Sequence, residues 1–167
     1  MSLELRHIKQ IDIEKVVELE RISNEIDGNL LNPWTLTADQ ILKIVGQNQQ
    51  LDKGIYETRV WVVEDETKEI VGSLAVEYQP TSFNVVFNTF IANRENDVLK
   101  TCCDFLKAKV RKSSTRKSIV ICLRDSDNAN LRILLPFWKL QGFQTKLIPN
   151  YFENSMDAWQ CTYTENK

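Results

Sequence analysis

Three strand-like segments that follow one another, with no helix between them, constrain the fold of this chain more than any other feature. Residues 58–80, "TRVWVVEDETKEIVGSLAVEYQP", consist of two apolar runs around a polar turn, a pattern typical of a β-hairpin. After Pro80, the stretch "SFNVVFNTFIA" (82–92) predicts a third, long strand. Next come a helix from about Val98 to Val110, the strand "SIVICLR" (118–124) and a helix over 128–141. This order predicts a mixed sheet with helices on both faces.

The two ends of the chain extend this order. "LELRHI" (3–8) alternates as a strand does, and apolar residues at helical spacing predict a helix over 12–23 with Asp12 as its N-cap. Thr37 and Gln40 form a capping-box pattern that predicts a second helix from residue 38. Gly142 is expected to end the last helix at the C′ position, although Pro136 inside that helix removes a backbone donor. Two strands, over 143–152 and 157–165, are expected to close the chain.

Length and charge favour an ordinary globular protein. The 167 residues suit one domain spanning 1–167, with enough chain for a proper core. A net charge of -2 gives no general attraction to nucleic acid or to an anionic membrane, so neither is expected as a partner. The sequence has no apolar stretch of membrane-spanning length, and we expect a cytoplasmic protein.

One segment is strongly basic. Residues 107–117, "KAKVRKSSTRK", are rich in Lys and Arg and contain no acid. We interpret them as a solvated helix end and loop, because cations are favoured near a helix C-terminus. A nucleic-acid patch is the less favoured alternative, since the segment itself lacks aromatic side chains for base stacking.

The cysteines do not form a metal-binding pattern. Cys102, Cys103, Cys122 and Cys161 include no C-x-x-C pair, and His7 is the single histidine. A zinc site needs several Cys or His at ligand spacing, so we expect no metal and interpret the adjacent Cys102 and Cys103 as core or boundary residues.

Five segments of the sequence stand in a particular order and spacing along the chain. They are "LELRHIKQIDIEKVVELERIS", "LNPWTLTADQI", "VWVVEDETKEIVGSLAVEY", "SIVICLRDSDNANLRILLPFWKLQGF" and "PNYFENSMDAWQCTY". Together they resemble the GNAT superfamily of acetyl-CoA-dependent N-acetyltransferases over nearly the whole chain. The resemblance is greatest to the bacterial branch that acetylates protein N-termini, typified by ribosomal-protein alanine N-acetyltransferase.

The resemblance implies an α/β (α+β) fold in which two neighbouring parallel strands of a mixed central sheet splay apart. The pantetheine arm of acetyl-CoA would lie between them, here between "FNTFIA" (87–92) and "SIVICLR" (118–124), with the pyrophosphate at the start of the next helix. The acceptor would be a peptide or another primary amine. The residues implied for acetyl-CoA are Phe90, Ile91, Asn96, Lys100 and Asn130, and those implied for the acceptor are Trp34 and Tyr151.

The turn before that helix departs from the family pattern Arg/Gln-x-x-Gly-x-Gly/Ala. It contains no glycine, and it carries Glu95 and Asp97 where two phosphate charges would lie. Side chains with a Cβ crowd a backbone that must approach a ligand closely. On the alternative interpretation, Asn96 or Asp97 simply caps the helix.

The family's proton-transfer groups are also replaced. The branch has a glutamate that takes the proton of the attacking amine, and Cys122 stands in its place. It also has a tyrosine that protonates the leaving thiolate, where this chain has Phe137 and Trp138. Glu77 is then the nearest carboxylate that can act as a base, directly or through a water. Tyr151 or Tyr78 is the replacement acid, and strand alternation points Glu77 and Tyr78 to opposite faces.

Two functions follow from these observations. The first is an acetyltransferase, because holding two reactants together accelerates acetyl transfer even with few catalytic groups. The second is a catalytically inactive binding or scaffolding module of the same fold, with a protein partner, because turn glycines, base and acid are all replaced. Binding of acetyl-CoA distinguishes an intact cofactor site from a repurposed one.

Overall fold

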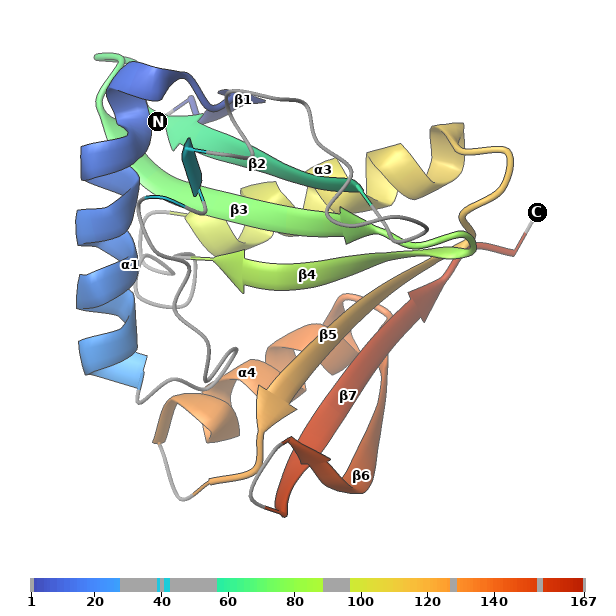
Figure 1. Cartoon of the computed structure of the whole chain (residues 1–167). Helices are drawn as coiled ribbons and strands as arrows, with labels where there is room; N and C mark the ends of the chain where they lie inside the picture. The colour runs from blue at the N-terminus through green and yellow to red at the C-terminus, as the bar shows by residue number, and fades with distance from the viewer. Residues whose placement is uncertain are drawn as a thin grey trace.

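The computed structural model describes residues 2–27, 39, 41–42, 57–88, 97–126, 129–152 and 155–166. At its centre is a seven-stranded mixed sheet in the order β1-β2-β3-β4-β5-β7-β6 (Figure 1). All neighbouring strands are antiparallel except β4 and β5, which are parallel. The strands are β1 (Glu4–His7), β2 (Glu57–Glu64), β3 (Ile70–Tyr78), β4 (Ser82–Asn88), β5 (Ser118–Arg124), β6 (Gln144–Phe152) and β7 (Met156–Thr164).

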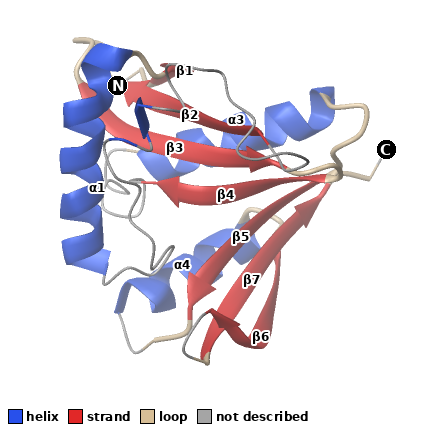
Figure 2. Ribbon diagram, viewed as in Figure 1, coloured by secondary structure: helices blue, strands red, loops and turns tan. Residues whose placement is uncertain are grey.

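Helices cover both faces of this sheet, as the sequence predicts. A short 3-10 helix, η1 (Gln10–Asp12), leads into α1 (Ile13–Asp27), which lies over one face and contacts β3 (Figure 2). The other face is covered by α3 (Val98–Lys112) and α4 (Ala129–Leu140). None of the helices in the described ranges is long and apolar enough to cross a membrane.

Within the described residues the predicted order of elements is confirmed, with small differences at the ends of elements. Asp12 does not stand at the N-cap of α1 but ends η1, where its carboxylate accepts the backbone N–H of Lys9 at 2.7 Å. In the third strand, the described part ends at Asn88, and the predicted continuation lies outside the described residues. The second helix is described only at residues 39 and 41–42, so its predicted capping box also lies outside.

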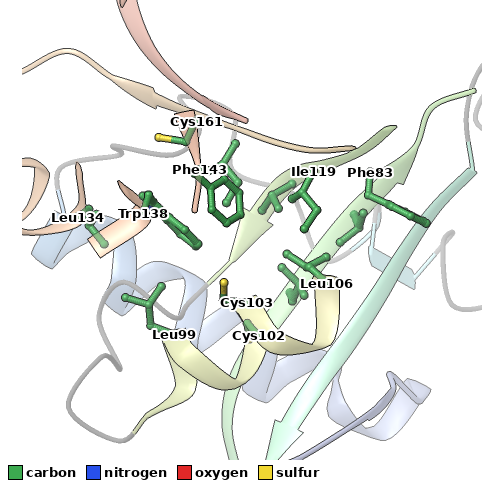
Figure 3. Close-up of a cluster of buried hydrophobic side chains, with 14 of the residues drawn as sticks. Phe83, Leu99, Cys102, Cys103, Leu106, Ile119, Leu134, Trp138, Phe143 and Cys161 are labelled. Carbon is green, nitrogen blue, oxygen red and sulfur yellow. The ribbon is translucent and has the colours of Figure 1, made fainter. Parts of the chain in front are cut away.

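The main core lies between the sheet and the pair α3–α4 (Figure 3). On α3, the buried residues recur at helical spacing and form one apolar stripe: Val98, Leu99, Cys102, Cys103, Leu106 and Val110. Both adjacent cysteines are buried in this core, as predicted, and burial raises the pKa of Cys103 to about 11. A smaller core lies beneath α1, where Ile13 and Val16 pack against Val60, Val62 and Ala75 of the sheet.

The C-terminus of α4 confirms the predicted role of Gly142. Its φ of 87° lies in the left-handed region that glycine adopts without strain. Gly142 N–H donates to the Lys139 carbonyl at 3.0 Å, and Phe143 N–H donates to the Trp138 carbonyl at 3.0 Å. This is the Schellman pattern, and the rings of Trp138 and Phe143 complete it with centroids 4.9 Å apart.

Arg6 joins three elements near the N-terminus. Its guanidinium donates to both carboxylate oxygens of Asp12, at 2.7 and 3.1 Å, and to Glu64 Oε1 at 2.7 Å. Asp12 is only 5% exposed, so its carboxylate is shielded from solvent although Arg6 is partly exposed, and the pair ties β1 to η1 and β2.

Candidate functional site

The two parallel strands part from each other along their length. Cα partners between β4 and β5 occur at Ser82/Ser118, Phe83/Ile119 and Asn84/Val120. Beyond these pairs β4 continues to Asn88 and β5 to Arg124, and the two strands diverge (Figure 1). The splayed parallel strands implied by the resemblance are therefore present.

A register row crosses the sheet at the point of divergence. It runs over six strands through Thr58, Glu77, Asn84, Val120, Thr162 and Gln144. Directly paired residues project from the same face, so these side chains share one face of the sheet. Val60 and Ala75 lie two residues from Thr58 and Glu77, so they project from the same face as the row. Both pack beneath α1, and α1 therefore covers this face at β2 and β3. At β5, β7 and β6, no described helix covers this face (Figure 2).

Alternation along β5 brings Cys122 to the same face. Ile119, Ile121 and Leu123 are fully buried in the main core, whereas Val120 and Cys122 between them are half-buried. Burial that alternates with a period of two residues indicates a strand with one side in the core and the other side partly open. Cys122 therefore lies beside the gap between β4 and β5.

Tyr151 lies on β6, the strand at the edge of the sheet, and its side chain reaches this face. Its hydroxyl is within side-chain hydrogen-bonding reach of the Cys122 thiol, which also interacts with Gln160 of β7. Burial raises the pKa of Tyr151, and the neighbouring Cys122 and the negative charge of Glu77 raise it further. Burial also raises the pKa of the Cys122 thiol. The predicted base Glu77 and the predicted acid Tyr151 thus lie close enough to interact electrostatically.

The hydroxyl of Tyr78, the other nominated acid, belongs to the opposite face. Its ring packs against the main core and contacts the Phe83 ring, with centroids 4.9 Å apart. The prediction that Glu77 and Tyr78 point to opposite faces is confirmed, which leaves Tyr151 as the candidate acid. Trp138, at the family's tyrosine region, is fully buried in the main core and offers no group to this face.

The start of α3 is unusual for a capped helix. Asp97 precedes the helix with φ 55° and ψ 10°, in the left-handed region, and its side chain makes no capping hydrogen bond. Asp97 therefore stands at the N-cap position, as one alternative predicted, but it does not act as a side-chain cap, which is typical of an extended backbone, and the other alternative, Asn96, lies outside the described residues. Lys100, predicted to contact the cofactor, forms an ion pair with Asp104 at 2.5 Å, one turn further on.

The remaining predicted residues are less well defined. Trp34, Phe90, Ile91 and Asn96 lie outside the described residues. Asn130 lies in the first turn of α4. Within the described ranges, no group of three or more His, Cys, Asp or Glu side chains could hold a metal ion.

Sequence reasoning missed the polar residues that complete this face. Asn84 of β4 and Gln160 and Thr162 of β7 all project from it, and none was predicted. The polar–apolar alternation in "DAWQCTY" indicates which side of β7 is buried, and the two β7 residues follow from it. To predict that Asn84 lies on this face, the pairing register of β4 with β3 and β5 must also be known.

No protein-family model matches the sequence, and no curated protein is similar to it. Solved structures are similar over almost the whole chain. An acetyltransferase from Salmonella typhimurium that modifies the N-terminal serine of the ribosomal protein L7/L12 has a TM-score of 0.73 and 13% identity, with 99% of this chain and 96% of that chain covered. A ribosomal L7/L12 acetyltransferase in complex with coenzyme A has a TM-score of 0.72 and 13% identity, covering 99% and 95%.

An N-acetyltransferase from Staphylococcus aureus Mu50 has a TM-score of 0.71 and 16% identity, with 98% of each chain covered. The sheet order, the parted strands and these likenesses together show that the chain has the GNAT fold. The expected α/β (α+β) class with a mixed central sheet is confirmed. Acetyltransferases of ribosomal proteins, which the sequence phrases resemble, are among the proteins that share the fold.

Proposed function

We propose that this chain is an N-acetyltransferase that binds acetyl-CoA between β4 and β5 and acetylates a protein N-terminus or another primary amine. The observation that carries the proposal is the divergence of β4 and β5 beyond Asn84 and Val120, with Glu77 and Tyr151 on the face beside it. A complex with coenzyme A among the structures of this fold supports the choice of ligand.

The residues beside the gap fit an extended, partly polar ligand. Where β4 and β5 diverge, the facing edges of residues 85–88 and 121–124 are not paired with each other. Backbone N–H and C=O groups at such edges pair readily with an added extended segment. Bound acetyl-CoA would supply the activated thioester, and the chain's own residues would orient it and the amine.

The two candidate catalytic residues divide the proton transfers. The Glu77 carboxylate would accept the proton of the acceptor ammonium group, directly or through a water, and so free the amine as a nucleophile. The Tyr151 hydroxyl is protonated at neutral pH, as any tyrosine is, and its raised pKa extends the protonated range to higher pH. It would donate that proton to the thiolate sulfur of the leaving coenzyme A, on this same face of the sheet.

The other predicted residues keep their proposed roles. Phe90, Ile91, Asn96 and Asn130 would contact acetyl-CoA, and Trp34 the acceptor. Lys100 would have to exchange its partner Asp104 for a phosphate, which weakens its contribution.

A second candidate function is a catalytically inactive binding module of the same fold. It is favoured by Cys122, a thiol with a raised pKa, at the position of the family's glutamate, and by the buried Trp138 near the position of its tyrosine. Such a chain would keep the parted strands without turning over a substrate.

Thermal unfolding with acetyl-CoA tests the binding step. At a concentration of one hundred times Kd, a ligand stabilises the folded chain by about 2.7 kcal/mol, and we expect a corresponding rise in Tm. The same measurement with coenzyme A, which lacks the acetyl group, is the comparison. A larger rise in Tm with acetyl-CoA indicates a specific contact to the acyl carbonyl. No rise in Tm at millimolar acetyl-CoA contradicts an intact cofactor site and supports the module.

Turnover tests the chemical step separately. The Cys122→Glu variant restores a carboxylate beside Tyr151, and we expect it to increase acetylation of a model peptide by about tenfold or more. Cys161→Ser, which changes a thiol buried in the main core, is the matched control with no expected gain. Binding of acetyl-CoA without turnover in either the natural chain or Cys122→Glu supports the inactive module.

A further inference from the structure

A pocket of about 270 Å³ lies on the opposite face of the sheet from the candidate site, beside the C-terminal end of α3. Four cationic side chains line it: Arg59 of β2, Lys109 and Lys112 of α3, and Arg116 in the segment that follows α3. Its aromatic wall is formed by Tyr78 at the end of β3 and Phe83 at the start of β4. We call this cavity the α3 basic pocket.

Aromatic rings contact three of the four cations of this pocket, Arg59, Lys109 and Arg116. The guanidinium carbons of Arg59 and Arg116 lie 4.9 and 5.1 Å from the centroid of the Tyr78 ring. Arg116 Nε also donates to the Gln79 carbonyl at 2.6 Å. The Lys109 ammonium lies 4.9 Å from the Trp61 centroid. Contacts of this kind position a cation without neutralising its charge.

The charge of the α3 basic pocket is poorly compensated. Glu57 pairs with Arg59 through two hydrogen bonds of 2.7 and 2.9 Å. For Lys109, Lys112 and Arg116, the described part of the chain provides no carboxylate within ion-pair distance. Burial together with the positive charges of Arg59 and Lys112 lowers the pKa of Lys109.

Other cations of the same helix show the contrast. Lys107 donates to the Gln141 carbonyl at 2.6 Å, and Arg111 lies 3.6 Å from a carboxylate oxygen of Glu165. The basic segment 107–117 therefore contains two cations outside the pocket, Lys107 and Arg111, and three that line it without a carboxylate partner, Lys109, Lys112 and Arg116. The aromatic side chains that the segment itself lacks are supplied by β2, β3 and β4.

We infer that the α3 basic pocket binds a compact phosphate-bearing anion, a pyrophosphate group that is either free or part of a nucleotide. Guanidinium and ammonium donors arranged around one cavity match the several oxygen acceptors of such a group. The volume suits a small ligand rather than a folded partner.

This site is separate from the proposed acetyl-CoA site and does not depend on it. Acetyl-CoA would place its pyrophosphate at the start of α3, whereas the pocket lies at the end of this helix of 15 residues. At 1.5 Å per residue the two ends are roughly 20 Å apart.

A titration of the full chain with sodium pyrophosphate at constant ionic strength, followed by amide NMR shifts, tests the inference. We expect saturable binding to one site, with the largest shifts at residues 59, 78, 83, 109, 112 and 116. Lys112→Gln should weaken the affinity about three- to tenfold, because one charge of the pocket is lost. Arg111→Gln, the matched control, removes one charge from the same helix outside the pocket and should change the affinity by less than about twofold.

Further ligands identify the source of the phosphate. Affinity for ADP that exceeds the affinity for pyrophosphate, at the same residues, indicates a nucleotide, and equal affinities indicate that the pyrophosphate group alone is recognised. Both results support the inference. It is overturned by the absence of saturation, by equal weakening in Lys112→Gln and Arg111→Gln, or by shifts centred on residues 97–101. It is also overturned if single-stranded RNA binds there and pyrophosphate does not compete.

Discussion

The hydroxyl of Tyr151 on β6 lies beside the thiol of Cys122 on β5, although β7 separates these two strands in the sheet. The pairing of β6 with β7 is irregular between Ile148 and Phe152, where Asn150 has a φ of 52°. This irregularity precedes Tyr151 and changes the side-chain direction that a regular strand would impose. The candidate acid thus depends on a local break in the strand.

Tyr151→Phe should reduce kcat for peptide acetylation by about 100-fold while leaving the KM for acetyl-CoA nearly unchanged. The phenyl ring retains the packing against Phe152, and only the hydroxyl is lost. Tyr163→Phe is the control, because the Tyr163 hydroxyl donates to Glu165 away from the gap. Equal kcat values for Tyr151→Phe and the natural chain would exclude the hydroxyl as the acid.

The pH dependence of the natural chain gives a second expectation. A tyrosine that acts as an acid must be protonated, and the raised pKa of Tyr151 keeps it protonated beyond its usual pKa of about 10. We therefore expect kcat to show no decline assignable to Tyr151 up to about pH 9.5. A decline centred below pH 9 that disappears in Tyr151→Phe argues against this environment.

Glu77→Gln tests the base. At neutral pH we expect kcat/KM to fall by about tenfold, because only about a tenth of an acceptor amine with a pKa near 8 is unprotonated at pH 7. The defect should shrink as pH rises above the amine's pKa of about 8, since the amine then loses its proton to solvent. Rates as a function of pH, compared with Glu69→Gln in the β2–β3 turn, measure this. A defect that is the same at every pH indicates a positioning role instead.

Asp12→Asn should destabilise the chain by about 1–3 kcal/mol, because it breaks the pair of the solvent-shielded Asp12 carboxylate with Arg6. The hydrogen bonds from Arg6 hold the pKa of Asp12 below its usual value of about 3.9. The contribution of the pair is therefore complete above pH 4–5 and is lost as the pH falls through the lower folded-state pKa. Denaturant unfolding from pH 7 to pH 3 should show the natural chain and Asp12→Asn converging in acid.

Asp104→Asn is the control for that series. Its ion pair with Lys100 is exposed and lies within one helix, so its loss should cost less than about 0.5 kcal/mol. If Asp12→Asn is as mild as Asp104→Asn, the clamp between β1, η1 and β2 is not a main source of stability.

Local patterns in the sequence were sufficient to predict the order of the described elements and a mixed sheet, whereas the splayed parallel strands were implied by the resemblance to the GNAT superfamily. The β2–β3 hairpin follows from a polar turn between two apolar runs, and the end of α4 follows from Gly142, because both depend on neighbours in the chain. The candidate site was predicted only in part. Glu77 could be assigned to one face by alternation, whereas its proximity to Tyr151 depends on the order of strands β4 to β7 and on the irregularity in β6.

The α3 basic pocket illustrates the same limit of local reasoning. Tyr78 and Phe83 are more than twenty residues away from Lys109 in the sequence, so a search for aromatic residues within the basic segment does not find them. They reach it because β3 and β4 lie beneath α3, which is a property of the tertiary structure.

On the proposed function, the divergence of β4 from β5 has a consequence for the range of acyl groups that the gap admits. Few backbone pairs join the two halves of the sheet, while the main core beneath α3 and α4 is continuous under both of them. Leu106 of α3 and Ile121 of β5 are fully buried in this shared core on the reverse side of the sheet, so we expect their bulk to influence the width of the opening. We therefore expect substitutions in the core between the sheet and α3, which does not contact the substrate, to change the preference for a short or a long acyl chain.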